Sequence, residues 1–398
     1  MNHDDITSHI SFGRLAFADL PAVAPFARFR AAVREPDGPE VVFRHAPDHE
    51  IALPPDGLVR GRTVFGAEAP APVDAPSGAP PQIWLRGLSS IALNDAILAP
   101  RSMAVASPVR GLLDTALDSP AVKQGRLSAV DPDFTEAEPD TWRLLRPVPG
   151  IASTILPVGG ARSSSYGRFL FEGLCGALLH HETLGPGIGL AGPPLATWQK
   201  EIFDLLGLGD AYLALRRPTR FRKIVTTDLN AWTARAPNPL ARTIFDRIRA
   251  VLPAADGPRR VMLRRGAGNR RLMRERERVE AVAGQFGFSI VDPAMLSAAA
   301  QAQLFAGATA VIGETGAGLA NLGFCDPETR VLEIQSDRLP DGRARAACHM
   351  MGLHWHVFFG VADGEPGMAP GMAPGGGFGY AVDPNAFAAT LDRVFGAP

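Results

Sequence analysis

The last third of the chain alternates short apolar runs with helical patterns, and this alternation limits its possible folds more than any other feature. Strand-like runs lie at residues 260–263, 288–291, 309–312 and 331–334, and helical patterns lie between or after them at 271–286, 297–306, from 317 onward and at 385–395. Strands and helices that alternate at this spacing indicate parallel βαβ units. We therefore expect an α/β fold with helices covering a parallel sheet.

The rest of the chain predicts a second α/β lobe behind an irregular start. Proline recurs through residues 1–80, so this stretch is expected to be an irregular lead-in. Helical patterns follow at 169–181, 195–208 and 239–252, with a strand at 222–227. We expect three parts: the lead-in at 1–80, an N-terminal lobe at 81–250 and a Rossmann-like C-terminal lobe at 251–398. Residues 364–379 are expected to form a surface loop.

The charge balance and the cysteines exclude several classes of protein. With 40 Lys and Arg against 41 Asp and Glu, the net charge is -1, which argues against a nucleic-acid binder or a polybasic membrane protein. No apolar run approaches the ~20 residues of a membrane-spanning helix, and the polar start shows no signal core. Cys175, Cys325 and Cys348 lie far apart, as expected for buried thiols. We expect a cytoplasmic protein with at most peripheral membrane association.

A glycine-rich stretch follows the run at 309–312 and leads into a helical pattern. Its sequence is Gly313-Glu314-Thr315-Gly316-Ala317-Gly318-Leu319-Ala320-Asn321. Glycine lets the backbone approach a ligand closely, and a helix N-terminus presents N–H groups and partial positive charge. Such a junction suits a phosphate. Taken alone, the turn is equally compatible with glycines that serve only packing.

Arginine clusters just after the run at 260–263. Residues 259–278 contain nine arginines and two glutamates. Arg264 and Arg265 follow the expected strand, and Arg270 and Arg271 open the next expected helix; guanidinium groups of this kind bind phosphate in bidentate fashion. The remaining arginines of the helix alternate with glutamate and predict a solvated face with local ion pairs: Arg274, Arg276 and Arg278.

The arginines and the glycine turn are expected to form one site. Both follow strands of a parallel sheet, and ligands bind outside the carboxyl ends of such strands. An arginine pair facing a glycine-rich helix start would hold a diphosphate without a metal ion, and the sequence contains no H-E-x-x-H motif or clustered metal ligands.

Several spaced motifs, taken in order, resemble the catalytic domain of glycosyltransferase family 61 over about residues 150 to 340. They are Tyr166-Gly167-Arg168-Phe169-Leu170-Phe171-Glu172-Gly173-Leu174, Trp198-Gln199, the run from Arg265 to Glu275, Phe286 to Pro293, Gln301, Phe305 to Ala308, Gly313 to Asn321, and Leu332-Glu333. The resemblance implies a capsular or exopolysaccharide type of enzyme with a two-lobed, GT-B-like fold. It also implies an inverting transfer from a nucleotide-sugar donor to a glycan or lipid-linked glycan acceptor, without a further cofactor.

The resemblance assigns the site residues and leaves the catalytic base open. The donor is expected to be held by Arg264, Arg265, Arg270, Arg271, Gly316, Ala317, Gly318, Asn321 and Glu333. Arg168 and Thr315 stand where the family pattern has histidines. An inverting transfer needs a base to take the acceptor proton. We therefore consider Glu172 first and Glu314 second for that role, with Thr315 in the catalytic centre.

Two other functions remain open from the sequence. One is a nucleotide-sugar-binding subunit of a polysaccharide assembly system, because both histidines of the family pattern are replaced. The other is a nicotinamide-dependent oxidoreductase, although the turn is G-x-x-G-x-G rather than G-x-G-x-x-G and only Glu333 is placed as a ribose reader.

Overall fold

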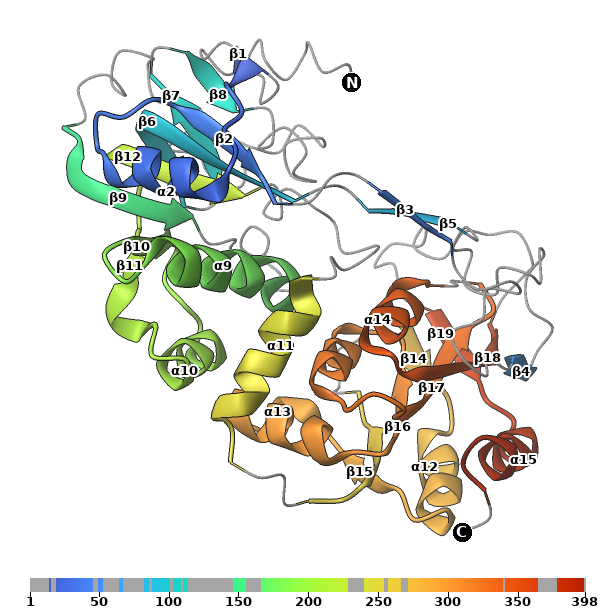
Figure 1. Cartoon of the computed structure of the whole chain (residues 1–398). Coiled ribbons are helices and arrows are strands. Elements are labelled where there is room, and N and C mark those ends of the chain that lie inside the picture. Colours follow the sequence, from blue (N-terminus) through green and yellow to red (C-terminus); the bar gives the residue numbers. More distant parts are fainter. Residues whose placement is uncertain are drawn as a thin grey trace. The chain divides into compact units, whose positions relative to one another are not determined.

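The chain forms two compact units in the computed structural model (Figure 1). The first unit comprises Met1–His49 and Arg86–Ala234, and the second comprises Glu50–Leu85 and Arg235–Pro398. This division differs from the expected one, because the N-terminal stretch is shared between the two units. The structure describes residues 14–15, 19–45, 49–52, 64–66, 82–85, 88–100, 103–108, 110–113, 146–154, 166–227, 240–253, 257–265, 271–338, 341–363 and 378–396.

The first unit is built on a mixed sheet. Its strands are ordered β1 (Arg14–Leu15), β8 (Gly111–Leu113), β7 (Ala104–Ser107), β6 (Ser89–Ala99), β12 (Thr219–Thr227), β9 (Val148–Thr154), β10 (Gly189–Gly192) and β11 (Tyr212–Ala214), with β2 (Val41–Arg44) also paired to β6. β12, β9, β10 and β11 are parallel, whereas β6 runs antiparallel to each of its neighbours. The first lobe is therefore α/β, as expected, but its sheet is mixed.

The helices of the first unit pack against β9 in the parallel part and against β2 in the antiparallel part. They are α2 (Phe26–Arg34), α8 (Tyr166–Arg168), η3 (Phe169–Leu174), α9 (Cys175–Leu184), α10 (Thr197–Leu205) and η4 (Gly209–Ala211). α2 buries Phe29 and Val33 against Val225 of β12 and Leu184 of α9. The expectation of irregular structure is therefore wrong for α2. The helices expected at 169–181 and 195–208 are confirmed.

The second unit contains a doubly wound sheet. Its order is β14 (Arg271–Met273), β19 (Phe378–Ala381), β18 (His354–Ala362), β17 (Arg330–Ser336), β16 (Ala310–Glu314), β13 (Arg260–Leu263) and β15 (Ser289–Val291), with β4 (Val64–Gly66) also paired to β18. All pairs from β15 to β18 are parallel. In chain order these five strands follow the 2-1-3-4-5 arrangement of doubly wound folds.

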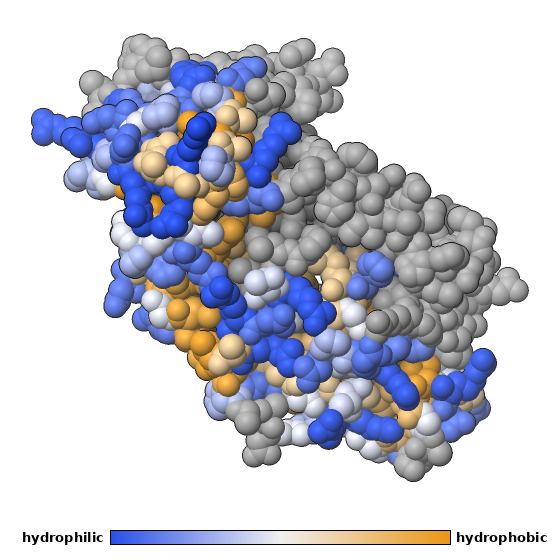
Figure 2. Space-filling model, viewed as in Figure 1, coloured by the Kyte–Doolittle hydropathy of each residue, from blue (hydrophilic) through white to orange (hydrophobic). Residues whose placement is uncertain are grey.

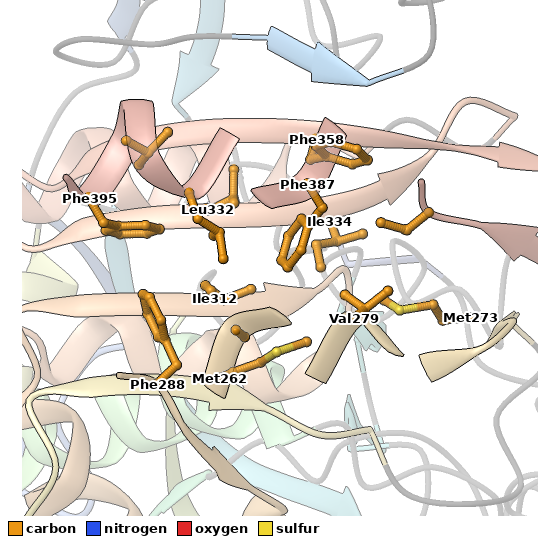
Figure 3. Packing of buried hydrophobic residues seen from close by; sticks show 14 of the residues in the cluster. Met262, Met273, Val279, Phe288, Ile312, Leu332, Ile334, Phe358, Phe387 and Phe395 are labelled. Atoms are coloured by element: carbon orange, nitrogen blue, oxygen red, sulfur yellow. The ribbon is translucent and has the colours of Figure 1, made fainter. Parts of the chain in front are cut away.

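Helices cover both faces of this sheet. They are α11 (Leu240–Val251), α12 (Arg276–Gln285), η6 (Pro293–Met295), α13 (Ala298–Gly307), η7 (Ala317–Phe324), α14 (Arg343–Met351) and α15 (Pro384–Phe395). Figure 3 shows the core on one face, where Val279 of α12 and Phe387 of α15 meet Ile312, Leu332 and other strand residues. On the other face, η7 contacts α11, α13 and α14.

The helix expected at 271–286 is wrong at its start. Arg271–Met273 forms β14, which pairs with β19 more than one hundred residues later in the chain. Glu275 then adopts a left-handed conformation (φ 48°), so α12 begins only at Arg276. A local sequence pattern does not reveal such a distant strand partner, and β19 itself lies partly within the expected surface loop. The rest of that loop, 364–377, lies outside the described residues.

Exposed apolar residues occur in several places on the described surface. Figure 2 shows hydrophilic and hydrophobic residues interspersed on the face it presents. The large exposed apolar side chains come from different elements: Val148, Leu213, Val251, Leu272, Met295 and Val361. Within the described residues, no helix is long and apolar enough to cross a membrane. All three cysteines are buried and unpaired by disulfides, as expected.

Candidate functional site

The strand order of the second unit reverses between β13 and β16. The chain passes from β13 outward to β15 and then returns to β16 on the other side of β13. In open α/β sheets, ligands bind at such a reversal, outside the carboxyl ends of the strands. Leu263 of β13 is paired with Gly313 of β16. Arg264 and Arg265 therefore leave the sheet beside Glu314 and Thr315, at the reversal itself.

Arg265 lies against the glycine turn. Its Nη1 donates to the main-chain oxygen of Thr315 at 2.8 Å. A Cβ atom added to Gly316 would lie 3.3 Å from the guanidinium carbon of Arg265. The backbone of Gly316 is extended (φ 170°), so its conformation does not require glycine. The absence of a side chain instead lets the guanidinium pack on the bare backbone. The expected meeting of arginine and glycine turn is confirmed for Arg265.

The turn then presents the start of η7. Ala317 and Gly318 form its first residues, and Gly316, at the N-cap, has no side chain to cover their N–H groups. A Cβ atom on Gly313 would lie 2.6 Å from Leu319, which holds the turn close to the sheet. The main-chain N–H groups at the start of η7, together with the Arg265 guanidinium beside them, are suited to binding an anion.

Arg264 points to a different partner. Its Nε donates to Oε1 of Glu280 at 2.9 Å, and its Nη2 donates to the other carboxylate oxygen. This hydrogen bonding raises the pKa of Arg264 and ties β13 to α12. The guanidinium of Arg264 therefore does not lie at the glycine turn.

The other two arginines of the expected site are less completely described. Arg270 lies outside the described residues. The backbone of Arg271 belongs to β14, at the opposite end of the sheet from β15, and its side chain is outside the described set. Their part in the site stays a prediction.

Glu314 is buried and fully engaged, which contradicts its expected role as a base. Its side chain is 3% exposed. Oε1 accepts from Nη2 of Arg276 at 2.7 Å, and Oε2 accepts from the hydroxyl of Tyr380 at 2.7 Å. Burial and the charge of Glu314 raise the pKa of Tyr380 well above its usual value, so the phenol remains a donor. A carboxylate with both oxygens occupied is poorly placed to take a proton from a substrate.

Thr315 and Glu333 support the turn from inside the protein. The Thr315 hydroxyl donates to Oε1 of Glu333 at 2.8 Å, and the Trp355 indole donates to Oε2 at 3.0 Å. Glu333 is 0% exposed, and burial raises its pKa to about 7, with a smaller effect from the charge of Asp341. In this arrangement Glu333 does not reach a ribose, which corrects the expectation, and the Thr315 hydroxyl is directed inward.

Asn321 is likewise part of the interior. It is 0% exposed, and its amide donates to Oε1 of Gln301 at 2.9 Å. The contact joins η7 to α13. Asn321 therefore fixes the position of the glycine-rich helix start and does not line its surface, which corrects the expected contact with the donor.

The first motif of the sequence lies on an unusual helix in the first unit. α8 ends at Arg168 and is followed without a break by the π-helical turn η3, which carries the backbone of Glu172, and then by α9. π-helical turns are rare and occur frequently at functional sites. The side chain of Glu172 is outside the described residues, so its role stays a prediction.

Sequence reasoning missed Arg276 and Tyr380. Arg276 was expected on a solvated helix face, but its side chain is only 18% exposed and also donates to the main-chain oxygen of Arg265 at 2.7 Å. Its alternation with glutamate gave no sign of this. By contrast, Arg278 forms the expected local pair with Glu275, and Arg274 pairs with Asp363 at the surface.

The comparison with protein families agrees with the motifs. The family model of glycosyltransferase 61 matches residues 123–332, which is more than half of the chain. The matched region contains η3 with Glu172, the end of β13 with Arg265, and the glycine turn. None of the curated proteins compared with the chain matches it. A family match of this extent supports glycosyltransferase activity, and the chain belongs to the glycosyltransferase 61 family.

Proposed function

We propose that this protein is an inverting glycosyltransferase that moves a sugar from a nucleotide-sugar donor to a glycan or lipid-linked glycan acceptor in polysaccharide biosynthesis. One observation carries the proposal: the guanidinium of Arg265 lies on Gly316 at the point where the strand order reverses. Transfer from such a donor releases a nucleoside diphosphate, and positive charge fixed beside the departing phosphates lowers the barrier.

The donor diphosphate is assigned to Arg265 and the turn Gly316-Ala317-Gly318. The guanidinium supplies full charge and directed N–H donors, and the start of η7 supplies main-chain N–H groups and a partial positive charge. Because arginine provides the positive charge here, the proposal includes donor binding without a divalent metal. The two units then correspond to the lobes of a GT-B-like enzyme, with the acceptor assigned to the first unit, and the expected location is cytoplasmic.

The catalytic base is assigned to Glu172. Glu314 is the other candidate, and both of its oxygens already accept hydrogen bonds from Arg276 and Tyr380. Glu172 lies on the π-helical turn within the matched family region. A carboxylate there would take the proton of the acceptor hydroxyl as the hydroxyl attacks the anomeric carbon.

A thermal-shift screen tests the donor class. Uridine, guanosine, adenosine and cytidine diphosphates and their sugar derivatives are compared with oxidised and reduced nicotinamide dinucleotides, each with and without EDTA. A ligand that binds only the folded state raises the melting temperature. We expect one nucleoside diphosphate to raise it equally in EDTA. A shift with nicotinamide dinucleotides alone would contradict the proposal, and loss of the diphosphate shift in EDTA would contradict metal independence.

A non-catalytic subunit that binds nucleotide-sugar is the second candidate. It is favoured by Arg168 and Thr315 at the positions where the family pattern has histidines, since an arginine cannot serve as a base near neutral pH. The two candidates differ in turnover. Nucleoside diphosphate release from the bound donor, with or without acceptor glycans, supports the enzyme, whereas donor binding with no release supports the subunit.

A further inference from the structure

A chain of buried and partly buried hydrogen bonds joins the ends of β13 and β16, which are the two arms of the strand reversal. The guanidinium of Arg276 donates through Nη1 to the main-chain oxygen of Arg265 and through Nη2 to Glu314, both at 2.7 Å. Tyr380 donates to the second oxygen of Glu314 at 2.7 Å. Arg265 follows β13, and Glu314 is the last residue of the neighbouring strand β16. One side chain from α12 therefore fixes the end of β13 relative to the end of β16.

The same two arms are joined a second time by Arg265 itself. Its side chain donates to the main-chain oxygen of Thr315, while its own main-chain oxygen accepts from Arg276. Both the backbone and the side chain of Arg265 are therefore held. Arg265 is only partly buried, so the restriction on its position comes from these two hydrogen bonds. This arrangement restricts where the Arg265 guanidinium can lie over Gly316.

We propose that Arg276 is a positioning residue for the nucleotide-sugar donor: through Glu314, Tyr380 and the main-chain oxygen of Arg265, it holds the Arg265 guanidinium ready over the glycine turn. The inference rests on the proposed role of Arg265 as the diphosphate ligand. Affinity increases when a binding group is ordered before the ligand arrives, because less conformational freedom is lost on binding. Arg276 thus acts on the donor through Arg265 and without touching it.

The neighbouring arginines of the same segment serve as a contrast. Arg278 is 70% exposed and pairs with Glu275 one turn away, and Arg274 is 62% exposed and pairs with Asp363. Exposed pairs of this kind contribute little. Arg276 differs because its partner Glu314 is buried and because its two partners, Glu314 and the main-chain oxygen of Arg265, belong to different arms of the site.

The experiment is a double-mutant cycle between Arg276 and Arg265, read by isothermal titration with the nucleoside diphosphate that binds best in the screen. Arg276→Lys keeps the charge beside Glu314 but cannot reach both partners with one planar fork. Arg265→Lys keeps a positive charge over the turn and leaves binding measurable. Arg278→Lys, on the same helix, is the matched control. If thermal melting shows that Arg276→Lys is not folded, Tyr380→Phe replaces it in the double-mutant cycle.

A positioning role predicts a specific pattern of dissociation constants. Arg276→Lys should weaken binding by about tenfold when Arg265 is present and by less than about twofold in the Arg265→Lys background, since coupled neighbours are non-additive. Arg278→Lys should change nothing. Tyr380→Phe should show the same dependence on Arg265 with a smaller loss.

Two kinds of failure can be told apart. If the wild type binds no nucleoside diphosphate, or if Arg265→Lys binds as tightly as the wild type, the proposed function of Arg265 is wrong and the inference falls with it. The positioning role alone is wrong if Arg265→Lys weakens binding but Arg276→Lys does not weaken it, or weakens it equally with and without Arg265. The same outcome for Tyr380→Phe applies where that variant replaces Arg276→Lys.

Discussion

The Nη1 atom of Arg265 donates a hydrogen bond to the main-chain oxygen of Thr315 at 2.8 Å, across the point where the strand order of the second unit reverses. This contact places a guanidinium beside the bare backbone of Gly316 and the start of η7. It connects the two sequence features that first suggested a phosphate site, and the predictions below follow from it and from the buried groups around it.

Gly316→Ala should weaken nucleoside diphosphate binding while the protein stays folded. The backbone of Gly316 is extended, so alanine is tolerated there, but its Cβ would lie 3.3 Å from the Arg265 guanidinium carbon and would displace that group. We expect a loss of about tenfold in affinity, the size of a disturbed neighbour interaction, with a melting temperature close to that of the wild type. Isothermal titration and thermal melting measure the two quantities.

Gly284→Ala is the control for that substitution. Gly284 lies on α12, and an added Cβ would meet nothing within 4 Å. Because Gly284 is the second-last residue of α12, alanine there should leave both the fold and the binding unchanged. Equal affinities for Gly316→Ala and Gly284→Ala would show that the close approach of Arg265 to the turn has no part in binding.

Glu172→Gln should separate binding from turnover. If Glu172 takes the acceptor proton, its amide should lower transfer by roughly 10²–10⁴-fold and leave the donor dissociation constant nearly unchanged. Glu182→Gln, at an exposed position on α9, is the matched control. Steady-state transfer rates and donor titrations are measured in parallel. Full activity of Glu172→Gln would remove this residue from the mechanism.

The first unit should lose stability in mild acid because of a buried histidine chain. His180 lies with Nδ1 2.5 Å from the Ser153 hydroxyl and Nε2 2.9 Å from that of Ser90, which is 2.7 Å from His45. Burial lowers the pKa of His180 to about 3 and that of His45 to about 4.

The sign of the pH effect follows from these values. Between the ordinary histidine pKa of 6.5 and about 4, the unfolded chain binds protons that the folded chain does not. The free energy of unfolding therefore falls as the pH drops through this range, by about 1.4 kcal/mol per pH unit for each histidine. Glu333 of the second unit changes the free energy of unfolding in the opposite direction, because its pKa is raised to about 7 and the folded chain binds the proton that the unfolded chain releases.

A histidine variant tests this account of acid sensitivity. His45→Gln keeps a polar group beside Ser90, but that group does not titrate. The free energy of unfolding of the first unit, measured by urea denaturation, should therefore depend less steeply on pH below about 6.5 than in the wild type. The two proteins should differ little near neutral pH. An unchanged pH dependence in His45→Gln would show that His45 is not among the groups responsible.

Lys223→Met should destabilise the first unit. Lys223 is 0% exposed, and its ammonium donates to the main-chain oxygens of Ala32 and Glu35 at 2.5 and 2.6 Å, at the end of α2. Methionine fills the space but leaves those oxygens without their donor, at a cost of about 1–3 kcal/mol. The midpoint of urea denaturation measures the loss, with exposed Lys200→Met as the control. Equal midpoints for the two variants would contradict this role.

The sequence predicts the second unit well where the structure depends on local pattern. The strands expected at 260–263, 309–312 and 331–334 appear as β13, β16 and β17. The helix expected at 297–306 appears as α13, which Ser297 caps by accepting from the Ala300 N–H at 3.1 Å. Apolar periodicity and capping residues act within a few positions, so one segment suffices to reveal them. The reversal between β13 and β16 then brings Arg265 and Gly316 together.

What the sequence does not reveal depends on distant partners. Arg276 looks like an exposed member of a charged helix, and only the folded chain brings it to Glu314 and Tyr380. Asn321 and Glu333 lie within the motifs of a donor site, yet both are 0% exposed and act by fixing the turn from inside. A motif identifies which residues belong to a site without separating those that touch the ligand from those that support them.

Isothermal titration of a nucleoside diphosphate into the wild type, Arg265→Ala and Arg274→Ala tests the central claim most directly. Removing Arg265 takes away a charge-assisted contact worth about 1.5–3 kcal/mol, so its dissociation constant should rise by roughly 10- to 150-fold. Arg274, which pairs with Asp363 at the surface, should have no effect. Equal affinity of all three proteins would contradict the assignment of the donor diphosphate to Arg265 and the glycine turn.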